Sequence, residues 1–234
     1  ALVKVGLDKV YTKIKVASAA AEGANSDSEA DETPLALIGS KGSEMVVAGL
    51  GNDIIVSSGG DDILEGGQGR DAVVVAKKAA ESTITRNAET KQWVVSRSEG
   101  TDTLVDVERV IFEDSTIALD VDKEQVGGQA ALALGALLGK DSVNDPALVG
   151  LVIGLLDEGM PFEELASRAI EALALTDNES LVTTLWTNLV GAPPSDDDKA
   201  EVFELLDSGT SPVELIRLAA FNELNEGNVD LVGI

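Results

Sequence analysis

The chain has 234 residues and a net charge of −25, with 42 acidic residues against 17 basic ones. Such a negative field repels nucleic acids and anionic membranes and attracts cations, so we expect no nucleic-acid partner. Zinc sites and histidine- or cysteine-dependent catalysis are excluded because both residues are absent, and no apolar stretch is long enough to span a membrane.

Residues 1–33 divide into a strand and a linker. Residues 2–16 alternate valine, leucine and isoleucine with lysine, which predicts an edge strand and lacks the continuous apolar stretch of a signal peptide. Residues 18–33 are rich in alanine, glycine, serine and acids, without apolar periodicity. We therefore expect a mobile linker there.

Residues 39–74 form four blocks of nine without a gap: GSKGSEMVV, AGLGNDIIV, SSGGDDILE and GGQGRDAVV. The eighth place is always a branched aliphatic residue. The fourth place is always glycine, at Gly42, Gly51, Gly60 and Gly69. The sixth place is always an acid, at Glu44, Asp53, Asp62 and Asp71, and further glycines fill the second place at Gly49 and Gly67. Composition alone does not produce such regularity.

Each recurring place has a physical role. Tight turns with positive φ need glycine, and the apolar eighth residue is the inward-facing middle of a short strand. Two blocks make one coil, so turns stack every 18 residues. Backbone carbonyls and two acids then line each gap between turns, which is the kind of oxygen cage that Ca²⁺ prefers.

The 18-residue spacing pairs Asp53 with Asp71 and Glu44 with Asp62, which predicts about two interior calcium sites. The Asp53/Asp71 gap matches the pattern best. The other gap is weaker because glutamate is one methylene longer and serines replace its second-place glycines. Asp102, in a Gly-Thr-Asp-Thr segment, is a candidate peripheral ligand, but a plain turn residue is the favoured interpretation.

Short β-branched segments between residues 72 and 119 predict flanking strands. After Asp120, apolar residues recur at helical spacing and predict helices over 129–138, 146–156, 162–173, 180–190, 196–206 and 212–224. The segment LLDEG at 155–159 recurs fifty residues later as LLDSG, so we expect two tandem helical units over about 128–175 and 178–224.

Other acids and the two tryptophans have ordinary structural interpretations. Asp196, Asp197 and Asp198 suit a helix start, and Asp61 with Asp62 suits a turn, so we expect no catalytic carboxylate pair and no enzyme. Core packing is the expected role of Trp93 and of Trp186.

The four blocks resemble the RTX, or haemolysin-type, calcium-binding nonapeptide GGxGxDxUx, which residues 66–74 match at every fixed place. Residues 100–104, 107–109 and 112–114 resemble the strand-rich segment that often closes RTX β-rolls. The helical pairs resemble a domain of unknown function repeated at the C-termini of some RTX proteins, with residues 185–189 as the matching segment.

This resemblance implies a fold, a cofactor and a location. The fold class is α+β: residues 34–122 form a short parallel β-roll with flanking strands around Ca²⁺, and residues 123–234 form an all-α tandem-repeat domain. The resemblance also implies export by a type I secretion apparatus and folding outside the cell on meeting calcium. The lack of cysteine and the secretion-signal-like tail, Asp230 followed by Leu231, Val232 and Ile234, agree with that location.

The leading hypothesis is a secreted, calcium-binding structural or surface protein without catalysis. One alternative is the C-terminal export and folding module of a larger secreted enzyme or adhesin. A second alternative is a subunit of a self-assembling extracellular polymer, in which residues 2–16 pair with a neighbouring chain. The expected partners are calcium ions, the secretion apparatus and, for the polymer, further copies or a cell-surface component.

Overall fold

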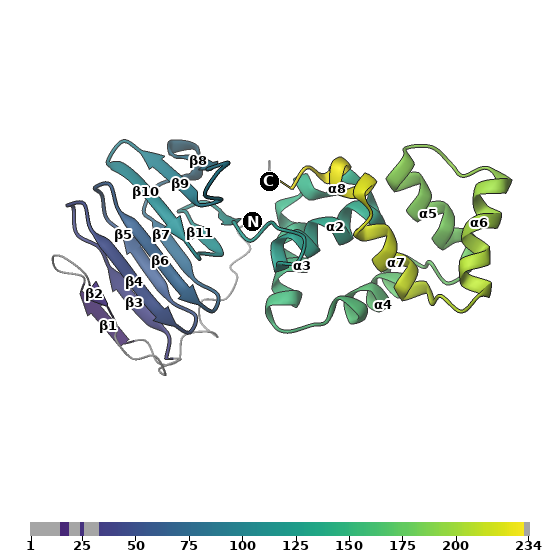
Figure 1. The fold of residues 1–234 in the computed structure, drawn as a ribbon, viewed down its shortest axis with the longest axis horizontal. Coiled ribbons are helices and arrows are strands. Elements are labelled where there is room, and N and C mark those ends of the chain that lie inside the picture. Colours follow the sequence, from purple (N-terminus) through teal and green to yellow (C-terminus); the bar gives the residue numbers. More distant parts are fainter. Residues whose placement is uncertain (1–14, 19–23, 26–32, 232–234) are drawn as a thin grey trace. The chain divides into compact units, whose positions relative to one another are not determined.

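The computed structural model describes residues 15–18, 24–25 and 33–231. The chain divides into two compact units, Ala1–Asp120, here the β unit, and Val121–Ile234, here the helical unit. Within the described residues the β unit holds the strands and the helical unit holds seven α-helices, so the chain is α+β (Figure 1).

In the residues that the structure describes, the strands of the β unit form two six-stranded sheets. One sheet contains, in spatial order, β1 (Lys15–Ser18), β3 (Leu35–Ile38), β5 (Ile54–Ser57), β7 (Ala72–Val75), β11 (Arg109–Ile111) and β12 (Thr116–Ala118). The other contains β2 (Ala24–Asn25), β4 (Met45–Leu50), β6 (Ile63–Gln68), β10 (Gly100–Val105), β9 (Trp93–Arg97) and β8 (Thr83–Arg86). From β3 to β7 successive strands alternate between the sheets, so two strands make one coil.

The coils keep a constant register where the repeats lie. Strand β5 pairs in parallel with β3 and β7, which places Ile54 opposite Ala36 and Ala72. Strand β4 pairs in parallel with β6, which places Met45 opposite Ile63. Residues 18 places apart in the sequence therefore lie side by side on neighbouring strands, as the nine-residue blocks predict.

Aliphatic side chains fill the space inside the β unit. The eighth residue of every block is at most 1% exposed, and these residues are Val46, Ile55, Leu64 and Val73. They belong to one buried cluster with side chains of later strands, including Val95, Leu104 and Val110. The predicted inward orientation of the eighth place is confirmed, and it follows from the alternation of side chains along a strand.

An antiparallel hairpin interrupts the repeating coils. After β7 the chain passes through a 3-10 helix (Ala79–Glu81) and strands β8 and β9, then returns to β10, which pairs in parallel with β6. Strand β9 pairs antiparallel with β8 and β10. Because of this insertion Ile63 lies opposite Thr103 and not opposite a residue 18 places later.

Two short described segments, 15–18 and 24–25, test the predictions for the N-terminal residues. Of the strand predicted over residues 2–16, only Lys15 and Val16 lie within the described residues, and they pair in parallel with β3 of the same chain. The predicted linker contains β2, which pairs in parallel with β4. The linker prediction is wrong for Ala24 and Asn25 and for Ser18, which ends β1, because strand pairing uses backbone groups and needs no apolar periodicity.

The helical unit repeats its order of helices. In the described residues its helices are α2 (Val126–Leu138), α3 (Pro146–Asp157), α4 (Phe162–Ala172), α5 (Asn178–Val190), α6 (Asp196–Asp207), α7 (Pro212–Ala220) and α8 (Glu223–Val229). Helix α6 is offset from α3 by 50 residues at both ends, and α5 is offset from α2 by 52. The order α2–α3–α4 therefore recurs as α5–α6–α7.

Polar side chains define where helices begin. At the start of α6, the Ser195 hydroxyl accepts the N–H of Asp198, and the Asp198 carboxylate accepts the N–H of Ser195. The helix predicted over 212–224 ends instead at Ala220, and Asn222 begins α8 by accepting the N–H of Leu224. The prediction of one continuous helix is wrong there, because an asparagine cap competes with helical continuation.

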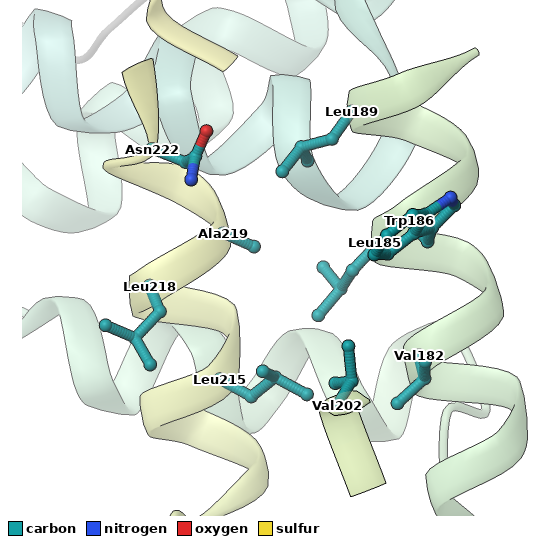
Figure 2. Close-up of a pocket in the computed structure, with 9 residues that line it drawn as sticks. All are labelled: Val182, Leu185, Trp186, Leu189, Val202, Leu215, Leu218, Ala219 and Asn222. Carbon is teal, nitrogen blue, oxygen red and sulfur yellow. The ribbon is translucent and has the colours of Figure 1, made fainter. Parts of the chain in front are cut away.

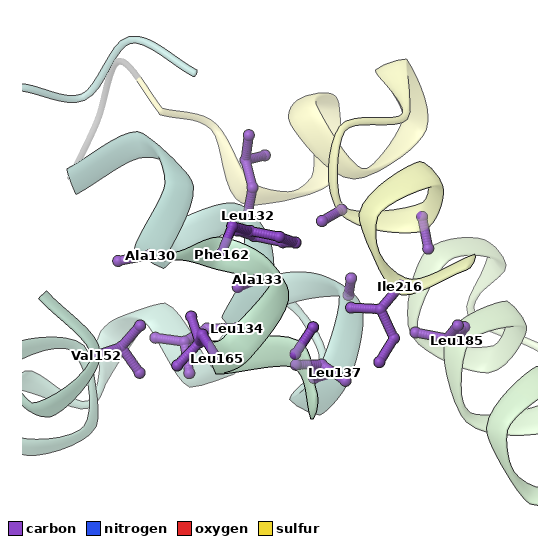
Figure 3. Close-up of a cluster of buried hydrophobic side chains, with 14 of the residues drawn as sticks. Ala130, Leu132, Ala133, Leu134, Leu137, Val152, Phe162, Leu165, Leu185 and Ile216 are labelled. Carbon is purple, nitrogen blue, oxygen red and sulfur yellow. The ribbon is translucent and has the colours of Figure 1, made fainter. Parts of the chain in front are cut away.

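Helix α2 forms the centre of the helical core. Its alanine and leucine side chains from Ala130 to Leu137 are at most 6% exposed. Figure 3 shows α2 side chains of this set in one cluster with Val152 of α3, Phe162 and Leu165 of α4, and Ile216 of α7; the labelled ones are Ala130, Leu132, Ala133, Leu134 and Leu137. An α-helix that is apolar on all sides is stable when other helices surround it. No helix in the described ranges has the length and apolarity that crossing a membrane requires.

Candidate metal centre

Asp53 and Asp71 stack on each other at the starts of β5 and β7. Because Ile54 is paired with Ala72, the residues before them are neighbours, and the N–H of Asp53 donates to Oδ1 of Asp71 at 2.7 Å. Both aspartates are fully buried. The structure thus brings together the two acids that the 18-residue spacing pairs.

The same contact recurs in the other turns. The N–H of Leu35 donates to Oδ1 of Asp53 at 2.6 Å, and the N–H of Glu44 donates to Oδ1 of Asp62 at 3.0 Å. In Asp53, Asp62 and Asp71 the second carboxylate oxygen, Oδ2, is buried and has no hydrogen-bond partner. An unpartnered buried acceptor costs about 1–3 kcal/mol, and more when charged, so these oxygens are suited to a cation.

Glu44 differs from the three aspartates. It is half-buried, and its Oε1 accepts the N–H of Ser40 at 2.6 Å within its own loop. Across the gap, Asp62 retains its unpartnered Oδ2. The Glu44/Asp62 gap therefore offers one aspartate oxygen and a glutamate that is already engaged, so we expect it to bind a cation more weakly than the Asp53/Asp71 gap.

Gly69 shows why the turns need glycine. Its φ is +130°, and a Cβ there would lie 1.7 Å from the carbonyl oxygen of Gly51 in the neighbouring turn. Positive φ angles also occur at Gly49, Gly51, Gly60 and Gly67. Gly42 does not have the positive φ predicted for the fourth place of a block. Its carbonyl oxygen would lie 2.6 Å from a Cβ atom placed on Gly60. Bare glycines thus let successive turns approach closely.

Burial raises the pKa of the stacked aspartates above the usual range of a carboxyl group. Burial raises the pKa of Asp71 to about 7, against the opposing hydrogen bond from the N–H of Asp53. Burial also raises the pKa of Asp62 to about 6 and raises the pKa of Asp53. Nearby carboxylates add to the shift of Asp71 and of Asp62 because like charges repel. A divalent cation among them would favour the ionised forms.

Glu108 extends the Asp53/Asp71 stack and was not among the predicted site residues. It directly precedes β11, and its Oε2 accepts the N–H of Asp71 at 2.7 Å. Burial raises the pKa of Glu108 as well. Asp106, with a φ of +47°, stands where the repeats have glycine. Glu108 and Val110 have the spacing of the sixth and eighth places of a block. The sequence pattern did not identify this block because Asp106 replaces the glycine of its fourth place.

Asp102 extends the Glu44/Asp62 stack from beyond the hairpin. It precedes Thr103, which is paired with Ile63. Asp102 is fully buried within β10, so its interpretation as a plain turn residue is wrong. Gly100, Asp102 and Leu104 have the spacing of the fourth, sixth and eighth places, and the inserted hairpin separates them from the gapless series.

The donor set fits Ca²⁺. Among the described residues no three acidic, histidine or cysteine side chains converge to hold a metal. A cation between turns would take oxygens from two acids and complete its shell with backbone carbonyls, the all-oxygen set that Ca²⁺ binds at about 2.3–2.6 Å. A polar hollow of about 380 Å³ borders Leu50, Gly51 and Asn52, just before Asp53, together with Pro34, Gln68 and Gly69.

The helical unit has an apolar groove of about 190 Å³. Figure 2 shows that it is lined from α5 by Val182, Leu185, Trp186 and Leu189, and from α7 by Leu215, Leu218 and Ala219. Trp186, expected in the core, is half-buried along this groove. Apart from Asn222 and the Trp186 indole the lining is aliphatic, so it offers no set of groups for catalysis or metal binding.

Comparison with protein families assigns the repeats. A family model described as the RTX calcium-binding nonapeptide repeat matches residues 38–73 in four copies. This match indicates that the repeats bind calcium. Among curated proteins the comparison found no match. The resemblance of the helical unit to a repeated domain of unknown function stays a prediction.

Proposed function

We propose that residues 34–122 form a calcium-loaded β-roll, in which Asp53 and Asp71 share one ion and Glu44 and Asp62 share another. The observation that carries this proposal is the unpartnered Oδ2 of the buried aspartates, at places that repeat along the coils. Parallel strands alternating between two sheets support the roll, and the match to RTX repeats supports calcium. The turn glycines, Gly42, Gly49, Gly51, Gly60, Gly67 and Gly69, would shape the carbonyl walls of the cages.

Without a cation the stacked acids oppose folding of the roll. Two carboxylates one strand spacing apart, about 4.8 Å, repel each other by roughly 3 kcal/mol at an effective dielectric constant of about 20. A bound calcium ion replaces this repulsion with attraction. Because the cage does not exist in the unfolded chain, calcium binding and folding of the roll are coupled.

The function that follows is that of a secreted, calcium-dependent structural or surface protein without catalysis of its own. Extracellular calcium modules bind at about 10⁻⁴–10⁻³ M, so the roll would fold on leaving the cell. Export by a type I secretion apparatus is part of this proposal and rests on the RTX resemblance. The tail proposed as its signal includes residues 232–234, which lie outside the described residues.

Two alternatives share the same calcium-dependent fold. The chain could serve as the C-terminal folding module of a larger secreted enzyme or adhesin, which the length of the encoded open reading frame would reveal. It could also be a polymer subunit, with residues 2–16 paired to a neighbour. The pairing of Lys15–Ser18 with β3 of the same chain argues against that exchange for this segment.

A calcium titration of the full chain tests the proposal. We expect the strand signal in circular dichroism to be lost in EDTA and to return at about millimolar calcium. Native mass spectrometry should show bound Ca²⁺ in the refolded chain. Magnesium is the control, because it demands a smaller octahedral shell and keeps its water, so it should not restore the signal. A strand spectrum unchanged by EDTA would contradict the proposal.

A further inference from the structure

The buried Asp102 makes contacts that the two proposed calcium sites do not explain. Its Oδ2 accepts hydrogen bonds from the Ser57 hydroxyl at 2.7 Å and from Nη1 of Arg97 at 2.6 Å. Its Oδ1 is buried and has no hydrogen-bond partner. One oxygen of this carboxylate is therefore held in place, and the other is available to a ligand.

Arg97 is the residue that orients Asp102. Its side chain is 3% exposed, and its guanidinium also donates to the Ser57 hydroxyl, so the three side chains form one buried cluster. Arg97 ends β9 and is paired with Gly100 of β10. The inserted hairpin thus brings a buried positive charge to the end of the Glu44/Asp62 stack.

Asp62 and Asp102 are neighbours across β6 and β10. Thr103 is paired with Ile63, and its N–H donates to the carbonyl oxygen of Asp62 at 2.8 Å. Asp62 is 2% exposed, and its Oδ2 lacks a partner, as Oδ1 of Asp102 does. Two buried carboxylates beside one guanidinium leave a negative charge without compensation, which is strongly unfavourable in a protein interior.

The turn before Asp102 approaches its neighbour as closely as the repeat turns do. Gly100 has a φ of +149°, and a Cβ on it would lie 1.8 Å from the carbonyl oxygen of Gly60. The corresponding distance from Gly69 to the carbonyl oxygen of Gly51 is 1.7 Å. The turns on either side of the Asp62/Asp102 gap therefore approach each other as closely as those of the Asp53/Asp71 gap, although Asp102 lies beyond the matched residues 38–73.

We propose that Asp62 and Asp102 hold a further divalent, oxygen-seeking cation, Ca²⁺, in the gap between β6 and β10. Oδ1 of Asp102 is its carboxylate ligand from β10, and Oδ2 of Asp62 would serve this ion as well as the one proposed between Glu44 and Asp62. Arg97 is a positioning residue that holds the other oxygen of Asp102. This inference rests on the proposed calcium-binding function and adds a site that spans the inserted hairpin. Without a bound cation, the Arg97–Asp102 ion pair would satisfy Oδ2 of Asp102 but would leave Oδ1 of Asp102 and Oδ2 of Asp62 without a partner.

The double variant Arg97→Gln/Asp102→Asn tests this site. It removes the ion pair and the new ligand together, so neither residue leaves an unpaired buried charge behind. In native mass spectrometry and calorimetric titration of the full chain, we expect it to bind one Ca²⁺ fewer than the wild type. The matched control is Arg109→Gln/Asp120→Asn, which alters the other buried arginine–aspartate pair of the described β unit and should keep the full ion count.

The outcomes separate a failure of the proposed calcium-binding function from a failure of the additional Asp62/Asp102 site. A wild type that binds no calcium would overturn the proposed function together with this inference. A calcium-binding wild type and a double variant with the same ion count would overturn the inference alone. If the double variant does not regain its strand signal in calcium, anomalous diffraction from wild-type crystals grown with calcium decides the matter. A peak between Asp62 and Asp102 supports the site, and no peak there refutes it.

Discussion

The β unit and the helical unit bury polar groups of different kinds. Among the described residues, most buried polar or charged side chains belong to the β unit: Asp53, Ser57, Asp62, Asp71, Asp102, Arg109 and Asp120. The helical unit buries Asn225, whose side-chain amide donates to the carbonyl oxygens of Leu132 and Ala220. One unit keeps unpartnered carboxylate oxygens inside, while the other satisfies its buried amide within the protein.

This difference indicates where the stability of each unit comes from. In the helical unit, apolar faces pack around α2, and side chains cap the starts of α3, α5, α6, α7 and α8, so the chain itself supplies these partners. In the β unit, the second oxygens of the buried aspartates need a proton or a cation from outside. We therefore expect calcium and pH to control the fold of the β unit and to leave the helical unit folded.

Removal of calcium has the largest expected effect. EDTA should erase the strand signal in circular dichroism and leave the helical signal, because only the β unit couples folding to ion binding. In hydrogen exchange, the amides of residues 39–74 should lose protection while those of residues 180–224 keep it. Simultaneous loss of protection in both segments would show that the two units unfold as one and that the helical unit is not stable without calcium.

Acid should partly substitute for calcium in the β unit. Burial raises the pKa of Asp71 to about 7 and that of Asp62 to about 6, so the folded, metal-free chain binds protons more tightly than the unfolded chain. An aspartate whose pKa is raised in the folded chain stabilises the fold fully at a pH below its pKa in the unfolded chain, which is about 3.9. This stabilisation is lost as the pH rises through the folded-state pKa values of about 6 and about 7. In EDTA, the strand signal in circular dichroism that is lost at about pH 7.5 should therefore return in part at about pH 5, where the protonated carboxyl groups stabilise the fold by on the order of 3 kcal/mol.

The control for this pH effect is Asp71→Asn, which mimics the protonated carboxyl group. It should flatten the pH dependence of the β unit in EDTA, because the group with the most strongly raised pKa no longer titrates. A pH dependence as steep as that of the wild type would show that other groups, or the net charge as a whole, control the response to acid.

Substitution of single acids should have a smaller and graded effect. Asp53→Ala or Asp71→Ala should weaken calcium binding by roughly tenfold or more, about 1.4 kcal/mol, because each removes an unpartnered ligand oxygen. Glu44→Ala should cost less, since Oε1 of Glu44 is already engaged by the N–H of Ser40. Calorimetric titration measures the three affinities, and equal losses would mean that the pairing of acids is wrong.

The smallest expected effect lies in the helical unit. Ser195→Ala removes the cap of α6 and should lower the stability of this unit by about 1 kcal/mol, equally with calcium and with EDTA. Ser167→Ala, an exposed substitution inside α4, is the control and should change stability by less than about 0.5 kcal/mol. Thermal unfolding followed by the helical signal measures both, and a loss that depends on calcium would contradict the independence of the units.

Much of the fold could be predicted because the chain is periodic. The places of Val46, Ile55, Leu64 and Val73 follow from a repeat in which each strand presents its middle residue inward. Helix positions follow from apolar spacing together with caps such as Ser195. The break at Asn222 was missed because apolar spacing continues through it, while the cap that Asn222 places on Leu224 depends on local backbone geometry.

The stacking of Asp53 on Asp71 follows from the sequence alone, because both belong to one uninterrupted repeat and parallel pairing converts its period into register. The places of Glu108 and Asp102 depend on the tertiary structure. Glu108 extends the Asp53/Asp71 stack, and Asp102 extends the Glu44/Asp62 stack after an insertion that breaks the period. The tertiary structure also brings Arg97 to Asp102 in the interior. Spacing along the chain predicts contacts within a periodic segment, but contacts across an insertion depend on how the inserted hairpin packs.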